Sequence, residues 1–221
     1  MIISNMGGAV EHWLGFQDKI GRSFMMNEDA LKYPLADYLV NEGGFNSNAI
    51  SLEIPHPFFS NRLMDLAVSD SNNQSQLKHS VELKLAKSTT RNQSERQRIF
   101  DDLMRLHLAN LVSNDKCYFI ISGKTVHFQR DFKNYTLNGA NFYSNWFSFS
   151  KGQSKSFNVL PETNLGYLNL YNSFITKYSG KYQSVPANSL TLPNQITTTC
   201  EFVTAFKSQF VPYMAGIWSV K

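Results

Sequence analysis

The chain has 221 residues, of which 42% are hydrophobic and 14% aromatic, and its formal net charge is +4. This composition excludes wholesale disorder, and because no run of about 18 apolar residues occurs, it predicts a soluble protein without a membrane span. Its two cysteines, Cys117 and Cys200, exclude a disulfide framework and a four-thiolate zinc site, and we expect both to have structural roles.

The N-terminal part of the chain indicates a cellular compartment and predicts a helix. Residues 1–8 lack the basic region and the apolar stretch of a secretory signal, so we expect a cytoplasmic protein. A helix is predicted over residues 27–40, with Asn27 as its cap and the glycines at 43–44 as its stop. Pro34 is expected to interrupt or bend this helix.

The middle of the chain alternates predicted strands with one long helix. The strands are predicted at residues 49–54, 62–68, 79–86 and 116–122. Before the last strand, Ser94 and Gln97 match a capping box, and the apolar residues that follow recur at helical spacing. The predicted order is therefore helix, three strands, helix, strand.

The C-terminal part differs from the rest in charge. Residues 1–125 hold 13 Lys and Arg against 14 Asp and Glu, whereas residues 126–221 hold 8 against 3. The basic part is also rich in aromatic residues and nearby lysines, which include Phe142, Tyr143, Trp146, Phe147, Phe149, Lys151 and Lys155. Such residues either follow phosphates and stack on bases, or form the core of a β-rich extension that lysines keep in solution.

Secondary structure is less clear in the C-terminal part. A helix is predicted over residues 165–178 and a final strand over residues 216–220. Residues 197–211 fit either a strand, because of the threonine run, or a helix, because phenylalanines recur at every fourth position.

Acidic residues inside apolar segments indicate a functional site. Asp65 lies in residues 62–68, and Glu82 and Lys84 lie in residues 80–86. On a strand, alternate side chains share a face, so Glu82 and Lys84 project to one side and the apolar residues between them to the other. Two carboxylates and an ammonium group on a mostly apolar sheet are costly unless they are compensated, which a divalent cation would do.

Asp65, the tripeptide Glu82-Leu83-Lys84 and the order of the elements resemble the PD-(D/E)xK nuclease superfamily over about residues 28–123. The resemblance implies a three-layer, restriction-endonuclease-like α/β core over about residues 25–125, with a central mixed sheet flanked by helices. Residues 126–221 would be an aromatic-rich elaboration of the same single domain. Met64 departs from the pattern, because it stands where the family usually has proline.

The resemblance also implies roles for residues. Asp65, Glu82 and the Leu83 main-chain carbonyl would hold Mg²⁺ or Mn²⁺, and Lys84 would orient the attacking water or stabilise developing charge. Asp65, Glu82 and Lys84 are thus the expected catalytic residues. Glu28 is the nearest candidate for an accessory acid on the first helix.

Other residues remain as alternatives or accessories. Glu42 and Glu53 are alternatives to Glu28 as the accessory acid. Arg91, Arg96 and Arg98, near the start of the long helix, are candidate phosphate contacts; the alternative is an ordinary solvated helix face.

Two functions follow from this sequence. The first is a Mg²⁺-dependent nuclease acting on DNA, in genome defence or DNA processing, with a homodimer as one arrangement for cutting both strands. The second is a catalytically inactive protein that uses the same fold to bind nucleic acid or protein, with Glu82 and Lys84 kept as an ion pair.

Overall fold

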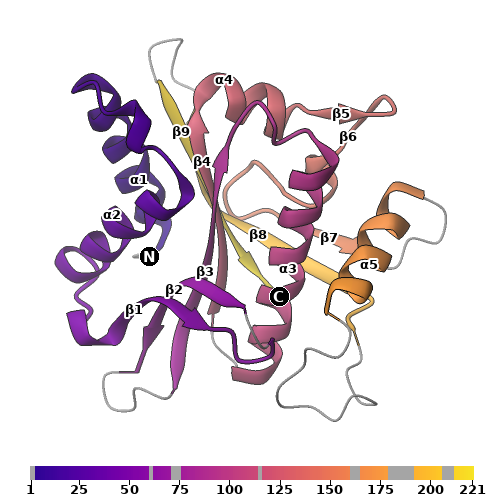
Figure 1. Ribbon diagram of the computed structural model, residues 1–221, viewed down its shortest axis with the longest axis horizontal. Coiled ribbons are helices and arrows are strands. Elements are labelled where there is room, and N and C mark those ends of the chain that lie inside the picture. Colours follow the sequence, from indigo (N-terminus) through magenta and orange to yellow (C-terminus); the bar gives the residue numbers. More distant parts are fainter. Residues whose placement is uncertain are drawn as a thin grey trace.

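The computed structural model describes residues 3–59, 62–70, 76–113, 116–159, 165–178, 192–205 and 212–221. In these residues the chain is α/β, with a mixed seven-stranded central sheet flanked by helices (Figure 1). The predicted fold class is confirmed at this level. Within the described part of the chain, no helix is both long enough and apolar enough to cross a membrane.

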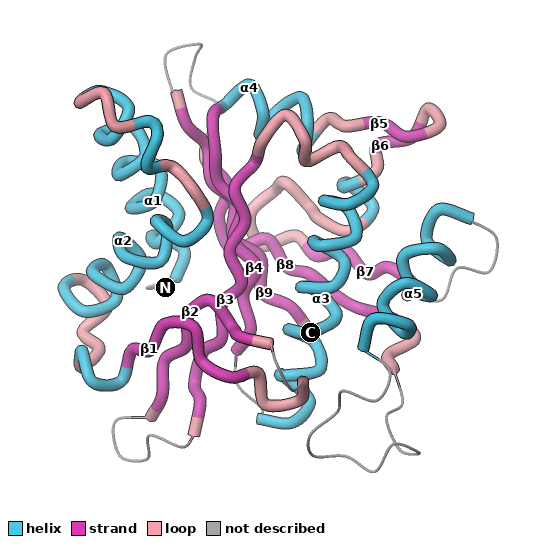
Figure 2. Tube along the Cα trace, viewed as in Figure 1, coloured by secondary structure: helices cyan, strands magenta, loops and turns pink. Residues whose placement is uncertain are grey.

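The elements follow one another as shown in Figure 2. The helices are α1 (Ile3–Lys19), α2 (Glu28–Asn41), α3 (Gln93–Ser113), α4 (Thr125–His127) and α5 (Leu165–Tyr178). The strands are β1 (Ile50–Pro55), β2 (Leu63–Ser69), β3 (Leu77–Ala86), β4 (Lys116–Lys124), β5 (Thr136–Leu137), β6 (Ala140–Asn141), β7 (Ser154–Asn158), β8 (Gln195–Val203) and β9 (Tyr213–Val220). Short 3-10 helices cover Ser23–Met25, Ser47–Ala49 and Tyr143–Asn145, and a π-helical segment covers Phe128–Lys133.

The central sheet has the strand order β1-β2-β3-β4-β9-β8-β7. β3 and β4 are parallel and are joined through α3, whereas the other neighbouring strands are antiparallel. Because β9 pairs with β4, strands from the C-terminal part belong to the same sheet as the four strands predicted before residue 125.

Helices cover both faces of the sheet, so two apolar layers form. α1 and α2 lie on one face, and α3 and α5 lie on the other (Figure 1). β4 shows the alternation: Tyr118 and Ile120 pack on the α1–α2 side, whereas Phe119 and Ile121 pack on the α3 side. A strand buried on both faces reads as the continuous apolar run seen in the sequence.

The aromatic residues of the C-terminal part belong to the core on the α3 side. Phe142, Tyr143, Trp146 and Phe147 are buried there, and Phe149 is partly buried against the same core. Burying a phenylalanine-sized side chain stabilises a fold by roughly 1.5–3 kcal/mol. The core interpretation of these rings is therefore confirmed, and they are not available to stack on bases.

Helix α2 forms where its local sequence predicts it. The Asn27 side chain accepts a hydrogen bond from the Ala30 amide (2.8 Å), and Gly44 has a positive φ of 68° just beyond the helix. Of the two outcomes expected at Pro34, an interruption does not occur, because α2 runs continuously through this buried residue. Packing on the sheet offsets the one backbone hydrogen bond that proline cannot donate.

Two further elements differ from the sequence prediction. Helix α1 was not predicted, since its three glycines lower helix propensity; a Cβ at Gly7 would lie only 2.2 Å from a ring carbon of Phe202, so glycine permits α1 to pack closely on β8. The predicted capping box was wrong. α3 begins at Gln93, before Ser94, and the side-chain amide of Gln97 donates instead to Asp101 and to the Leu170 carbonyl.

The ambiguity over residues 197–211 is settled in part. Residues 197–203 lie in β8, so the threonine run prevailed over the phenylalanine spacing. Residues 206–211 lie outside the described residues.

Cys117 and Cys200 are both buried free thiols, and burial raises the pKa of Cys200 to about 11.

Candidate active site

A cleft of about 320 Å³, lined by residues of α2, α3, α5 and the first three strands, is almost entirely charged. The carboxylates that line it are Glu28, Asp29, Glu53, Asp65, Glu82, Asp101 and Asp102. The basic residues that line it are Lys32, Arg62, Lys84, Arg98, Arg105 and Lys177. We call this set of residues the charged cleft.

The structure brings the predicted catalytic residues together. Asp65 lies on β2, Glu82 and Lys84 lie on β3, and Glu28 begins α2, and all four line the charged cleft. Glu82 and Lys84 reach residues of α3, while the apolar residues between and beside them pack on the opposite, α1–α2 side. The alternation predicted for this strand is confirmed.

Asp65 is anchored to the neighbouring strand. The pairing of β2 with β3 runs from Ser69 and Leu77 to Leu66 and Val81. Asp65 lies one residue beyond Leu66 and Leu83 two residues beyond Val81, and the Leu83 amide donates a hydrogen bond of 2.8 Å to Asp65 Oδ2. The carboxylate thus takes a main-chain donor of β3 and is held beside the Glu82-Leu83-Lys84 tripeptide.

Lys32 lies among three carboxylates that come from three different elements. Its Nζ is 2.9 Å from Asp29, 2.7 Å from Glu53 and 3.4 Å from Asp65, and its side chain is only 6% exposed. Burial alone would lower the pKa of Lys32, but hydrogen bonds to Glu53 and Asp29 and the charge of Asp65 raise it above its usual range. The ammonium group therefore stays charged and occupies a position surrounded by carboxylate oxygens.

A second ion-pair network links β3, α3 and α2. Arg105 contacts Glu82 (2.9 Å) and Asp102 (2.6 Å), Asp102 contacts Lys84 (2.9 Å), and Lys84 contacts Glu28 (3.5 Å). Charges alternate along this network, which offsets the cost of burying them. The Glu82–Lys84 ion pair expected for an inactive protein is replaced by pairs of each residue with α3.

Burial and neighbouring charges shift the pKa values of Glu82 and Lys84. Loss of solvent raises the pKa of Glu82 well above its usual range, and the nearby Asp102 and Asp65 add to the rise, although Arg105 and Lys84 oppose it. For Lys84, burial would lower the pKa, but the charges of Asp102, Glu28 and Glu82 outweigh burial and raise it. Lys84 is consequently a cation, whereas burial favours the protonated form of Glu82 even though Arg105 and Lys84 favour its ionised form.

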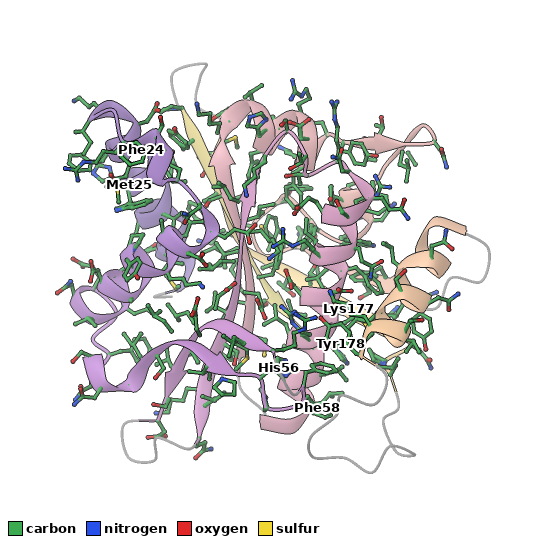
Figure 3. The ribbon with its side chains drawn as sticks, viewed as in Figure 1. Phe24, Met25, His56, Phe58, Lys177 and Tyr178 are labelled. Carbon is green, nitrogen blue, oxygen red and sulfur yellow. The ribbon has the colours of Figure 1, made fainter. Side chains whose placement is uncertain are left out.

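Helix α5 forms one wall of the charged cleft. Lys177 pairs with Asp101, the Tyr178 hydroxyl accepts a hydrogen bond from Arg105 (3.2 Å), and the Arg62 guanidinium lies over the Tyr178 ring at 5.4 Å. Figure 3 shows Lys177 and Tyr178 near His56 and Phe58 at this end of the molecule. The C-terminal part thus supplies groups to the site.

The three arginines predicted to contact phosphate have different surroundings. Arg98 lines the charged cleft, is half-exposed and pairs with Glu28 (3.5 Å) and Glu95 (3.0 Å). Arg96 is not among the described residues that line the cleft; it donates to the Tyr135 hydroxyl and lies over the Phe142 ring. Arg91 is exposed and is likewise not among those described lining residues.

Sequence reasoning missed several residues of the cleft. Glu53 was predicted only as an alternative acid, and Lys32, Asp102 and Arg105 were not predicted at all. A pattern was present on α3, where Asp102 and Arg105 are three residues apart inside a stretch of buried apolar residues. Charged side chains are rarely buried unless they are paired, so such a pair within a core helix indicates a site.

The donor set is chemically suited to Mg²⁺. Asp65 and Glu82 offer carboxylates and Leu83 offers a carbonyl, all hard oxygen ligands. Each of these oxygens now lies near a cation of the protein: Lys32 for Asp65, Arg105 for Glu82, and Lys84 for the Leu83 carbonyl (3.2 Å). In the described ranges, no group of three or more Asp, Glu, His and Cys side chains is arranged to hold a metal ion.

Comparisons with protein-family models, with curated proteins and with solved structures gave no match to this chain. The function is therefore argued from the charged cleft. Its geometry concentrates carboxylates and cations that come from helices on both sides of the sheet and from the strands between them.

Proposed function

We propose that this protein is a metal-dependent nuclease with a restriction-endonuclease-like fold that hydrolyses phosphodiester bonds in DNA. The observation that carries the proposal is that Glu28, Asp65, Glu82 and Lys84 line a single cleft. The order of elements supports it, since a helix precedes three antiparallel strands, and a crossover helix leads to a strand parallel to the third.

Asp65, Glu82 and the Leu83 carbonyl would hold Mg²⁺ or Mn²⁺. When bound, the ion would lower the pKa of a water molecule and polarise the phosphate. The residues that hold it must first exchange contacts with Lys32 and Arg105 for contacts with the ion, because these cations now neutralise the two carboxylates.

Lys84 supplies a positive charge within the tripeptide itself. Asp102 and Glu28 hold its ammonium group from two sides, which limits the positions that it can take. A lysine fixed in this way can donate hydrogen bonds to a phosphate oxygen or to the attacking water, and it stabilises the negative charge that develops in the transition state.

A second function has one observation in its favour. Asp65 and Glu82 each contact a basic residue of the chain, so the charges of the cleft are already compensated without an added ion. This arrangement suits a catalytically inactive protein of the same fold that binds nucleic acid or another protein. The two proposals differ in whether a divalent ion displaces Lys32 and Arg105.

The test is cleavage of supercoiled plasmid and of single-stranded DNA by purified protein with Mg²⁺ or Mn²⁺. We expect nicking or shortening that EDTA abolishes and that Lys84→Ala loses. Well-folded protein that neither cuts nor shows calorimetric metal binding dependent on Asp65 would favour the inactive binding protein. Light scattering on the same sample tests whether the active species is a homodimer. A symmetric dimer would suit an enzyme that cuts both DNA strands in genome defence or DNA processing.

A further inference from the structure

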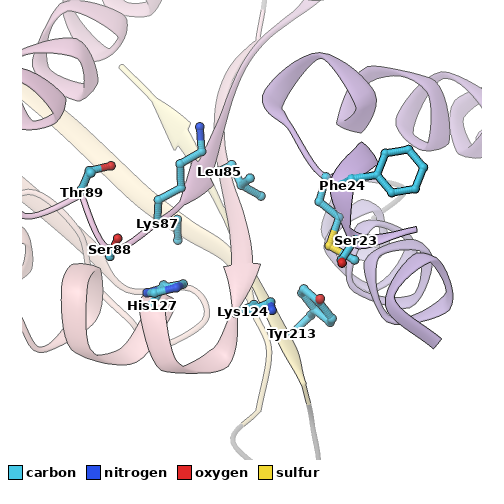
Figure 4. A pocket seen from close by; sticks show the side chains of 11 residues that line it. Ser23, Phe24, Leu85, Lys87, Ser88, Thr89, Lys124, His127 and Tyr213 are labelled. Atoms are coloured by element: carbon cyan, nitrogen blue, oxygen red, sulfur yellow. The ribbon is translucent and has the colours of Figure 1, made fainter. Parts of the chain in front are cut away.

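A second cavity, of about 560 Å³, lies beyond the end of β3 (Figure 4). It is lined by Leu85 and Ala86 of β3, by the loop that leads to α3, by the end of β4, and by Ser23, Phe24 and Met26. We call it the β3–α3 pocket. Its described lining contains two lysines and a histidine, and none of its described lining residues is a carboxylate, unlike the charged cleft.

The loop between β3 and α3 gives the pocket a preformed polar wall. The Lys87 amide donates to the Thr90 hydroxyl (2.8 Å), and the Thr90 amide donates back to the Lys87 carbonyl (3.0 Å). The buried Tyr143 hydroxyl donates to the Thr90 carbonyl (2.7 Å), which ties the turn to the core. Ser88 and Thr89, at the tip of this turn, are exposed and line the pocket.

His127 is oriented by a buried carboxylate. Its Nδ1 lies 2.9 Å from Asp131 Oδ2, so its other ring nitrogen, Nε2, is the one left to meet a ligand. Asp131 is fully buried; burial works against its ionisation, but hydrogen bonds from Arg130 and His127 outweigh burial and lower its pKa. An ionised Asp131 favours a proton on Nδ1 of His127.

The opposite wall carries apolar groups. Figure 4 shows Ser23 and Phe24 across the pocket from Ser88, Thr89 and His127, with Lys124 between the two sides and the Phe24 ring directed outward from the rim. Phe24 is 81% exposed although it lines the pocket rim, and the neighbouring Met25 is 41% exposed. Aromatic rings beside basic groups are the combination that holds a base and its phosphate.

We propose that the β3–α3 pocket binds one nucleotide of a nucleic acid strand, with the phosphate near Lys87 and Lys124 and the base on the side of Phe24. This assignment rests on the proposed nuclease function for the identity of the strand. Lys87 follows Lys84 by three residues, which at the rise of a strand is about 10 Å. A strand whose scissile phosphate lies at Lys84 therefore has a neighbouring nucleotide within reach of the pocket.

The first test measures binding without cleavage. Affinity of the full chain for a fluorescent oligothymidylate is measured in EDTA over a range of salt concentrations. Removing one lysine that neutralises a phosphate of a single strand lowers the slope of log affinity against log salt by about 0.7. We expect Lys87→Ala/Lys124→Ala, which leaves the single phosphate of the pocket without its lysines, to lower the slope by about 0.7, and the matched control Lys151→Ala/Lys155→Ala, at exposed lysines outside the pocket, to leave it unchanged.

A second test addresses the base. Loss of a stacked ring weakens single-strand binding by about fivefold or more, so we expect this loss for Phe24→Ala and not for Tyr33→Ala, whose ring is 66% exposed on α2 and does not line the pocket. A free mononucleotide, dTMP, should compete only weakly with the oligonucleotide.

Two results would overturn the inference: equal salt slopes for the two double variants, or equal effects of Phe24→Ala and Tyr33→Ala. These outcomes are separate from failure of the nuclease proposal. Binding in EDTA that depends on Lys87 and Lys124, in a protein that cuts nothing with metal, would retain the pocket and reject the nuclease. Cleavage with an unchanged salt slope would do the reverse.

Discussion

The charged cleft and the β3–α3 pocket are lined by successive residues of the same strand, β3, yet their charged groups are compensated differently. In the cleft, buried carboxylates are matched by lysines and arginines of the chain itself. In the pocket, Lys87 and Lys124 are exposed, and none of the described lining residues is a carboxylate. The pocket is therefore ready for an anion, whereas the cleft must exchange internal ion pairs before it can hold a metal ion.

The largest expected effect is on catalysis in the cleft. Glu82→Ala removes a proposed metal ligand, and we expect cleavage of plasmid with Mg²⁺ to fall by about 10³ to 10⁴-fold, because the ion and the developing charge both lose a partner. Glu42→Ala is the matched control, since Glu42, an alternative accessory acid in the sequence, is exposed just beyond α2 and is not among the described residues that line the charged cleft. Equal rates for the two variants would show that the cleft is not where the chemistry occurs.

The next largest effect concerns the ion pairs that compensate the buried charges of the cleft. Arg105→Met leaves Glu82 and Asp102 buried without their shared cation, and we expect a loss of about 3 kcal/mol in the free energy of unfolding. Arg98→Met removes a half-exposed arginine and should cost less than about 1 kcal/mol. Urea unfolding measures both losses, and similar values would mean that the network around Arg105 contributes little to stability.

A smaller effect is expected from pH, through His56 beside the cleft. Its Nε2 donates to the Arg105 carbonyl (3.2 Å), and its Nδ1 accepts from the Phe58 amide (3.0 Å), so the ring is neutral. Burial and then the charge of Arg105 lower the pKa of His56 to about 4. The unfolded chain, with a histidine pKa near about 6.5, therefore binds a proton first as pH falls.

The sign of this linkage is fixed by the lowered pKa. The contribution of His56 to stability is complete above about pH 6.5 and falls as pH drops toward 4, by about 3 kcal/mol in total. We expect His56→Asn, whose side chain does not titrate, to lose this part of the pH dependence in urea unfolding. His12→Asn, at an exposed position, is the control and should keep it; equal profiles for wild type and His56→Asn would refute the assignment.

The smallest predicted effect tests whether Lys32, a cation of the chain itself, competes with an added metal ion. Lys32→Met leaves Asp29, Glu53 and Asp65 without the ammonium group that they share, so we expect Mg²⁺ to bind about tenfold more tightly in calorimetry. Lys19→Met, at an exposed position of α1, should leave the affinity unchanged. Weaker binding by Lys32→Met would mean that Lys32 positions Asp65 for the ion and does not compete with it.

Local patterns were enough to predict several parts of the fold. Asn27 caps α2 because the hydrogen bond of a cap lies within one turn, and Glu82 and Lys84 share a face because strand geometry alternates side chains. The strands before residue 125 and helix α5 were found within a few residues of their predicted bounds. Helix α1 was missed because its three glycines lower helix propensity, and the close contact of Gly7 with β8 is one that no local pattern reveals.

By itself, the sequence determined that Asp65 lies on one apolar strand and that Glu82 and Lys84 share a face of another, because hydrophobic periodicity and alternation are properties of short segments. The pairing of these two strands was decided by the tertiary structure. Only the tertiary structure decided which charges meet them: Lys32 comes from α2, Arg105 from α3 and Lys177 from α5. Coulomb interactions depend on distance in space and on burial, and both are set by how helices pack on the sheet.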